Sequence, residues 1–321
     1  MSENIHINTK IPLEMRGQRL DRALAQLYPE YSRARWQQWI REGLLKINGH
    51  TAKPKAKLLG AEEIELRAET IVEVPWVGQN IPLNIVYEDE YLIIVNKPAG
   101  LVVHPGAGQP DHTLVNALLH YAPELEHLPR AGIIHRIDKE TTGLLVVARQ
   151  LSAHTVLVQQ LQQRAFLREY LALVRGVLIA GGTVDAPIGR HPRQRVKMAV
   201  VNGGRNAITH YRVAEHFRFH SLLQVKLETG RTHQIRVHMT HLGHPLVGDP
   251  VYGGRYQVLP DCPQVLQDNL KNFKRQALHA AKLGLKHPKT GEMQQWQAPL
   301  PDDMQDLLVQ LQADRDEFSH I

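Results

Sequence analysis

A single carboxylate, Asp138, stands in a short stretch between two apolar segments, where it could do chemistry. Arg136 comes two residues before it, and Thr141 opens a hydroxyl and glycine turn that leads into the apolar run 144–148. A carboxylate in this setting can serve as a nucleophile or as a base that takes a proton. It can equally be a turn aspartate that accepts backbone hydrogen bonds, and on its own Asp138 favours this structural role.

The segment 234–238 changes the balance between these two roles. Ile235 and Val237 alternate with polar residues, so we expect a strand whose apolar side chains face one side. Arg236 would then share the other face with a glutamine and a histidine. An arginine buried without a partner is costly, and Asp138 is a natural partner for it.

Tyr170 supplies a third candidate side chain. It begins the apolar run 170–174, where a tyrosine is usually a core residue whose hydroxyl reaches a polar partner. Further β candidates are at 85–87, 91–95, 101–103, 144–148, 208–213 and 222–228, and helical patterns lie near 113–121, 153–163 and 303–313. Many short strands with few helices predict an α+β fold on a mixed, largely antiparallel sheet with flanking helices.

Positive charge is concentrated near the N-terminus. Residues 16–57 hold ten lysines and arginines against three acidic residues, a net charge of +7 that exceeds the +6 of the whole chain. Such an asymmetry indicates an anionic partner for this part of the chain, and a solvated basic face is the alternative.

The same basic segment has the pattern of two short helices and a small sheet. Apolar residues of 20–27 recur at helical spacing, and Ser32 is a candidate N-cap for a second helix that ends at Gly43. The strand 44–47 and the dipeptide Asn48-Gly49 then indicate a hairpin. Several arginines lie on or beside the second helix, an arrangement that suits docking against a phosphate backbone.

Composition along the chain predicts two domains. The chain has 321 residues, of which 43% are hydrophobic, and this is enough for two domains with sizeable cores. Residues 60–80 are acidic and then irregular. We assign 1–75 to an N-terminal domain with its core at about 16–67, 76–82 to a linker, and 83–321 to a second domain.

The cysteine content and the N-terminus point to a compartment. Cys262 is the one cysteine, which excludes an internal disulfide framework and a multi-cysteine metal site and indicates reducing surroundings. The first residues lack the pattern of a signal peptide, and no apolar run approaches the roughly 18 residues of a membrane helix. We therefore expect a soluble cytoplasmic protein that does not associate with membranes.

Motifs for cofactor and metal chemistry are missing. The chain has no Gly-x-x-x-x-Gly-Lys-Ser/Thr loop and no Gly-x-Gly-x-x-Gly after a strand, so neither ATP nor a dinucleotide is expected. His238, His241 and His244 have a spacing of three, but no carboxylate accompanies them, so we do not expect a zinc site.

Taken in chain order, these segments resemble the RluA-type pseudouridine synthase family. The residues that carry the resemblance are Asn96 to Leu101, His135 to Gly143, Arg168 to Tyr170 and Gly230 to His238. The N-terminal segment is similar to an S4 RNA-binding domain through Arg19 to Arg22, Ser32-Arg33 and Gly43 to Gly49. The stretches 101–108 and 244–254 resemble one S4-bearing branch of the family that modifies large-subunit ribosomal RNA, and a second such branch is the alternative.

The resemblance implies an enzyme that isomerises specific uridines to pseudouridine in 23S ribosomal RNA, at the helix 69 loop. Asp138 would start cleavage of the glycosidic bond, Arg236 would pair with it, and Tyr170 would stack on the base after the base flips out of the RNA. No cofactor, metal or obligate protein partner is implied. A non-catalytic RNA-binding factor for ribosome assembly is the rival from another class, and a metal-dependent nuclease is a third alternative.

The resemblance also assigns residues to RNA binding. Arg136 would fill the space that the flipped base leaves, and His135 would orient the loop. The expected RNA contacts are His135, Arg136, Thr141, Arg231, Thr232, His233 and Gln234 near the reacting base, and Arg19, Arg33, Arg35 and Lys46 in the S4-like domain.

Overall fold

The computed structural model describes residues 2–28, 31, 33–71, 76–106, 108–194, 196–255 and 257–319. The chain divides into two compact units, residues 1–75 and residues 76–321, and each is described by itself. The segment 76–82, expected to be a linker, lies in the second unit and is hydrogen-bonded to Asn116. The side chain of Asn116 donates to the Val77 carbonyl at 2.9 Å, and the Gln79 N–H donates to the Asn116 carbonyl at 2.9 Å.

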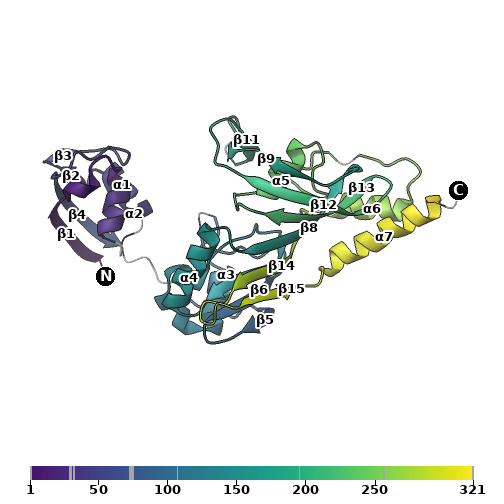
Figure 1. Cartoon of the computed structure of the whole chain (residues 1–321), viewed down its shortest axis with the longest axis horizontal. Coiled ribbons are helices and arrows are strands. Elements are labelled where there is room, and N and C mark those ends of the chain that lie inside the picture. The colour runs from purple at the N-terminus through teal and green to yellow at the C-terminus, as the bar shows by residue number, and fades with distance from the viewer. Residues whose placement is uncertain are drawn as a thin grey trace. The chain divides into compact units, whose positions relative to one another are not determined.

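Two helices and a sheet form the described part of the first unit (Figure 1). The helices are α1 (Leu20–Leu27) and α2 (Arg33–Arg41), and the strands, in sheet order, are β1 (Ser2–Lys10), β4 (Glu63–Ile71), β2 (Leu45–Ile47) and β3 (His50–Thr51). Trp36 and Trp39 pack edge to face with ring centroids 5.2 Å apart in the core of this unit. Asn48 and Gly49 both have positive φ, which confirms the hairpin between β2 and β3. Ser32 lies outside the described residues.

Strands β1 and β4 include the acidic part of the segment 60–80, for which no element was expected from the sequence. β4 pairs with all of β1. Ile64 and Leu66 are fully buried, whereas Glu63 is exposed and Glu65 partly so. The segment therefore alternates as a half-buried strand does, and its charges belong to the outer face.

In the second unit, the described strands form a nine-stranded sheet with the order β5-β6-β7-β14-β8-β13-β12-β9, and β15 pairs with β14. Its strands are β5 (Ile85–Glu88), β6 (Leu92–Lys97), β7 (Thr142–Ala148), β8 (Leu167–Arg175), β9 (Gly182–Asp185), β12 (Ile208–His216), β13 (His220–Leu227), β14 (Leu278–Lys286) and β15 (Met293–Gln297). Among these pairs β7 and β14 run parallel and the others antiparallel. The α+β class with a mixed, largely antiparallel sheet is confirmed.

Helices cover both faces of this sheet (Figure 1). They are α3 (Leu114–Tyr121), α4 (Leu151–Gln162), α5 (Gln234–His241), α6 (Gln264–Asn272) and α7 (Asp302–Ser319). The second unit also has the short turns η2 (Pro123–His127) and η3 (Pro129–Gly132) and the small hairpin of β10 (Ile188–Arg190) and β11 (Met198–Val200). The short turn η1 (Leu13–Met15) belongs to the first unit. Every residue of β7 is buried, because Leu145 and Val147 pack with α3 and Leu144 and Val146 with α4.

The segment 234–238 is helical, and the expected strand there is wrong. Five residues are too few to tell the two-residue repeat of a strand from the 3.6-residue repeat of a helix. All residues from Gln234 to Met239 are buried, so the alternation of polar and apolar residues did not mark an exposed face. In the helix, Ile235 and Met239 both face the main core, one turn apart. Arg236 therefore projects from a helix and not from a strand.

A second expected strand, 101–103, is also wrong. Only an isolated bridge joins Val102 to Thr113. The carbonyls of Val102 and Val103 accept the N–H groups of Leu114 and Val115 at 2.8 and 3.2 Å, so this apolar stretch serves the start of α3.

Candidate active site

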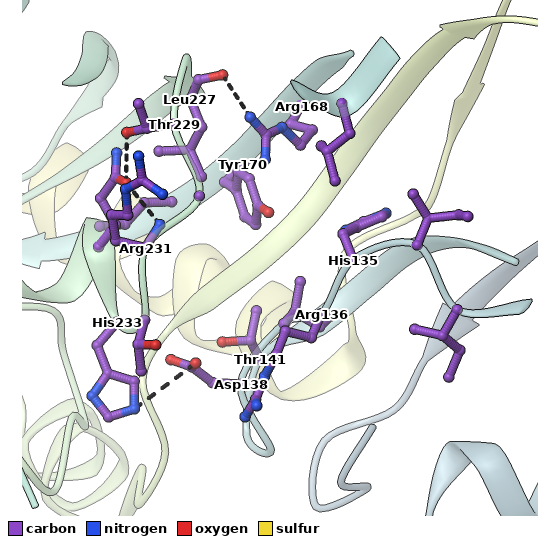
Figure 2. A pocket seen from close by; sticks show the side chains of 18 of the residues that line it. His135, Arg136, Asp138, Thr141, Arg168, Tyr170, Leu227, Thr229, Arg231 and His233 are labelled. Carbon is purple, nitrogen blue, oxygen red and sulfur yellow. Dashed lines mark hydrogen bonds and ion pairs between the residues drawn. The ribbon is translucent and has the colours of Figure 1, made fainter. Parts of the chain in front are cut away.

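Segments that are far apart in the chain border one cavity of about 710 Å³ in the second unit. The loop between η3 and β7 carries Asp138, the start of β8 carries Tyr170, and the turn between β13 and α5 carries His233. Figure 2 shows these side chains around one space, with the Tyr170 hydroxyl directed into it and His233 beside Asp138.

The Asp138 loop is anchored where it enters β7. The Thr141 N–H donates to the Asp138 carbonyl at 3.1 Å, and the Thr141 hydroxyl accepts a hydrogen bond from Gln276 at 3.0 Å. Gly143 has φ +109, and a Cβ there would lie 2.3 Å from the Ala280 carbonyl oxygen. The sequence therefore needs glycine where β7 meets β14, and Thr141, predicted to touch RNA, is buried in the loop's support.

Lys97, at the end of β6, lies beneath this loop. Its side chain is fully buried, and its ammonium donates to the carbonyls of Pro98 at 2.6 Å and Lys139 at 2.8 Å. Burial lowers the pKa of Lys97 to about 7, although the nearby carboxylates of Glu140 and Asp138 oppose that shift. Lys97 thus ties β6 directly to the residue that follows Asp138.

Arg236 joins two carboxylates. Its Nη1 donates to Oδ2 of Asp138 at 2.9 Å, while Nε and Nη2 donate to Oδ2 and Oδ1 of Asp249 at 2.7 and 2.9 Å. The predicted contact between Asp138 and Arg236 is therefore present. The Asp138 side chain remains 20% exposed, against 5% for Arg236, so the acid is the member of the pair that a substrate can reach.

Electrostatics favour the charged forms of Arg236 and Asp249. Burial works against the charge of Arg236, but hydrogen bonds and charges from Asp249 and Asp138 outweigh it and raise the pKa of Arg236 further above its ordinary value. Burial alone would raise the pKa of Asp249, yet the Arg236 guanidinium and the N–H groups of Tyr252 and Val251 hold that pKa below its ordinary value.

His233 lies on the other side of Asp138. Its backbone is left-handed, with φ 57, where the chain turns into α5. Nδ1 is 2.8 Å from the Tyr252 hydroxyl, and Nε2 is 3.9 Å from Oδ1 of Asp138. Burial lowers the pKa of His233 despite the neighbouring carboxylate. A neutral imidazole beside Asp138 can accept or donate a hydrogen bond to a substrate.

Tyr170 presents its ring to the cavity from β8. The side chain is buried, and no hydrogen bond to its hydroxyl is found within the described ranges. Burial raises the pKa of Tyr170, so the phenol stays protonated at neutral pH. Beside it, Arg168 donates to the carbonyls of Glu228 at 3.2 Å and Leu227 at 3.5 Å, and so fastens the end of β13 to β8 (Figure 2).

The two residues before Asp138 differ in their surroundings. Arg136 is exposed at the cavity, as an RNA contact requires. His135 accepts the Val146 N–H on Nε2 at 3.3 Å, and burial together with the charge of Arg168 lowers the pKa of His135 to about 3. This neutral, hydrogen-bonded imidazole supports the loop.

Residues 231–234 divide between lining and support. Gln234 is buried, its amide donates to Ile208 and Thr209, and its carbonyl accepts from Thr229 and the Arg231 N–H. Arg231 donates to the Asn206 carbonyl at 2.9 Å and lines the cavity, and Thr232 is exposed there.

The predicted RNA contacts of the first unit surround a buried acid. Asp21 is fully buried and accepts hydrogen bonds from Arg19, Arg33 and Gln37. The two arginine side chains remain 39% and 46% exposed, so they can hold Asp21 and still face solvent. Arg35 lies over the Trp39 ring at 5.9 Å, and Lys46 is exposed on β2.

Three residues of the site were missed from the sequence. Asp249, Tyr252 and Lys97 each contact the Asp138 loop or its partners. They lie in stretches that carried the family resemblance, but no residue spacing linked them to Asp138. The one local sign that could have drawn attention to Asp249 is its place between a glycine and a proline.

The described residues offer neither a metal site nor a membrane-spanning helix. Among the described residues there is no group of three or more histidine, cysteine, aspartate or glutamate side chains that could hold a metal ion. His238 is buried, and its ring nitrogens bond the Thr209 hydroxyl at 2.8 Å and the Ala186 carbonyl at 3.0 Å. None of the described helices combines the length and hydropathy that a bilayer crossing requires.

Comparison with known proteins defines the class of this fold and site. A family model for RNA pseudouridylate synthase matches residues 91–241, and a model of the S4 domain matches residues 18–64. The chain therefore belongs to the RNA pseudouridylate synthase family, whose members are isomerases, and it carries an S4 domain.

Two curated relatives match nearly the whole chain, and a solved structure matches most of it. Ribosomal large subunit pseudouridine synthase D of Pseudomonas aeruginosa is 54% identical over 318 residues, 99% of each chain. The protein of the same name from Escherichia coli K12 is 52% identical over 99% of this chain and 98% of its own. Among solved structures, human RNA Pseudouridylate Synthase Domain Containing 4 has a TM-score of 0.57 at 26% identity and covers 71% of this chain and 93% of its own.

Proposed function

We propose that this chain isomerises specific uridines to pseudouridine in large-subunit 23S ribosomal RNA, at the helix 69 loop. The observation that carries the proposal is the accessible carboxylate of Asp138, fixed by Arg236 at 2.9 Å in the wall of a cavity. The relatives at 54% and 52% identity are named for the ribosomal large subunit, and this supports the choice of RNA.

In the proposed reaction the N1–C1′ bond of uridine breaks and a C5–C1′ bond forms. The proton on C5 is lost and N1 gains one, so no group enters or leaves the RNA. Asp138 begins the cleavage, either by attack through its carboxylate or by removal of a proton. Because Arg236 binds Oδ2, the oxygen left for the substrate is Oδ1, on the side of His233.

A stacked uracil cannot reach Asp138, so the base must leave the RNA helix at a cost of roughly a few kcal/mol. Tyr170 offers its ring as a surface on which the flipped base stacks. Arg136, exposed at the rim of the cavity, takes the place that the base leaves in the RNA. The cavity of about 710 Å³ is large enough for a nucleotide.

The first unit supplies affinity for RNA in this proposal. Its exposed cations, among them Lys46, neutralise phosphates and release bound counterions. Asp21 holds Arg19 and Arg33 in fixed positions on the surface, so these arginines meet the phosphate backbone with little loss of side-chain entropy.

A map of pseudouridines across ribosomal RNA tests the proposal. Cells that lack this gene should lose pseudouridine in the helix 69 loop, and an intact copy of the gene should restore it. Loss of pseudouridine at other sites of the same RNA would show that the chain has the target of the other S4-bearing branch and does not modify helix 69. An unchanged map with defective ribosome assembly would contradict the proposal and favour a non-catalytic assembly factor.

A further inference from the structure

The second unit has another cavity, of about 470 Å³, that shares no lining residue with the active site. Its walls come from the end of β8, the turn between β12 and β13, residues 246–250 and the C-terminal end of α6. Its volume falls within the range of small-molecule sites.

A buried polar group in this cavity has no partner. His220 is 3% exposed, and its Nδ1 makes no hydrogen bond with any of the described residues. Buried polar atoms in folded proteins are almost always hydrogen-bonded. Burial and the charge of Arg175 lower the pKa of His220 to about 4, so the imidazole in the wall of the cavity is neutral.

The charged side chains around His220 are mainly positive. Arg175 donates to the Arg255 carbonyl at 2.9 Å, and Lys274 donates to the Lys271 carbonyl at 2.6 Å, so these contacts leave the charges unneutralised. Lys271 is exposed at the opening. Arg218 also lines the cavity, but it is paired with Asp314 at 2.8 Å.

The one acidic side chain in the lining does not offset these cations. Asp249 is held by Arg236 through both carboxylate oxygens, and the N–H groups of Val251 and Tyr252 bond its Oδ1. The cavity therefore favours an anion.

Apolar side chains make up the remaining wall. Leu246 is 1% exposed, Leu270 is buried and Phe273 is partly buried, and all three line the cavity. A phosphate alone would satisfy the cations but would leave this apolar wall uncovered. A planar base can stack on a phenylalanine ring, a contact that tolerates any base.

We propose that this cavity binds a nucleotide, with its phosphate between Arg175, Lys271 and Lys274 and its base against the Phe273 ring. The ligand is either a free mononucleotide or an unstacked nucleotide of a bound RNA, since both present the same groups. The proposal does not depend on the reaction assigned to Asp138.

A chain of contacts links the wall of this cavity to the active site. Gly248 and Asp249 belong to its wall, and a Cβ on Gly248 would lie 2.5 Å from the Phe273 ring. Asp249 holds Arg236, which in turn holds Asp138. A ligand in this cavity would therefore contact the segment whose Asp249 positions Arg236, and Arg236 in turn positions the Asp138 carboxylate.

Calorimetric titration of the full chain with AMP, adenosine and inorganic phosphate tests the site. AMP avoids the uracil preference of the active site. We expect AMP to bind at least about tenfold more tightly than adenosine or phosphate, and Lys271→Gln with Lys274→Gln to weaken AMP about tenfold or more. Both lysines are exposed, so the double variant should fold as the wild type does. Lys286→Gln with Lys289→Gln, a pair of exposed lysines elsewhere, is the control.

Competition with a ribosomal RNA fragment separates the two sources. If the RNA supplies the nucleotide, the bound fragment excludes AMP, and the double variant weakens the fragment as well. If the ligand is free, AMP and the fragment bind together. Failure of AMP to bind the wild type, or equal binding by wild type and the double variant, would overturn the proposal. Loss of isomerisation in an Asp138 variant would leave it unaffected.

Discussion

Asp249 and Arg236 form a buried two-point ion pair, with Nε–Oδ2 and Nη2–Oδ1 distances of 2.7 and 2.9 Å. Only one further guanidinium nitrogen, Nη1, is used for Asp138, at 2.9 Å. The orientation of the Asp138 carboxylate thus depends on Asp249, which lies 111 residues further along the chain. Two N–H groups in turn fix Asp249.

Asp249→Asn should destabilise the fold and slow the reaction. The change removes the charge that compensates a buried guanidinium, and breaking one partner of a buried ion pair costs about 3–5 kcal/mol. Urea unfolding measures the stability, and single-turnover isomerisation measures the rate. Glu124→Gln is the control, because Glu124 holds Arg149 at 2.7 Å with side chains 49% and 28% exposed, so its loss should cost about 1 kcal/mol or less. Equal costs for the two variants would refute a special role of Asp249.

Tyr170→Phe separates the ring of Tyr170 from its hydroxyl. The hydroxyl has no hydrogen bond within the described residues, so its loss should change the free energy of unfolding by less than about 0.5 kcal/mol. The ring remains for stacking, so RNA affinity should be kept. The hydroxyl is directed into the cavity, where we propose that it transfers a proton during the reaction, so turnover should fall at least about tenfold. Tyr170→Leu should weaken RNA binding too. Wild-type turnover in the phenylalanine variant would restrict Tyr170 to stacking.

Arg136→Gln should affect structured RNA more than unstructured RNA. Arg136 is exposed, so the fold should be unchanged. Its proposed task is to fill the gap left by the flipped base, and that task has value only where the base must be unstacked. Isomerisation rates are compared on a hairpin and on a single strand of the same sequence. Lys139→Gln removes a neighbouring exposed charge on the same loop as the control. An equal loss on both RNAs would argue against a wedge.

Lys97→Met should change how stability depends on pH. Burial lowers the pKa of Lys97 from 10.5 to about 7. Between these values the unfolded chain holds a proton that the folded chain has released, so the free energy of unfolding rises with pH in this window. The wild type should gain stability relative to the variant as pH rises from about 7 toward 10, by at most about 1.4 kcal/mol per pH unit. Urea unfolding at several pH values measures this difference, and a difference independent of pH would contradict the shift.

Local sequence patterns predicted the elements that carry their own periodicity. Leu20 to Leu27 became α1, and the apolar run around Leu145 became β7. The patterns failed where tertiary contacts decide. β14 crosses the middle of the sheet, but its sequence Leu278–Lys286 mixes alanine, glycine and charged residues, and its register depends on β8 and β7.

The candidate site was predictable to a similar extent. Arg236 stood out as an arginine that needs a buried partner, and Asp138 as the natural partner for it. The functional roles of both residues, like that of Tyr170, came from the family resemblance. Lys97 could not be identified in this way, since its partners are backbone carbonyls, which every sequence contains. Whether Arg236 lay on a strand or a helix depended on the turn at His233, whose positive φ no local pattern revealed.

The most direct test of the whole account is isomerisation by Asp138→Asn, which keeps the shape of the side chain and removes its charge. The account predicts that this variant binds the RNA with an affinity within about twofold of the wild type and shows no turnover, because binding and chemistry use different groups. Measurable pseudouridine formation by the variant would contradict the account.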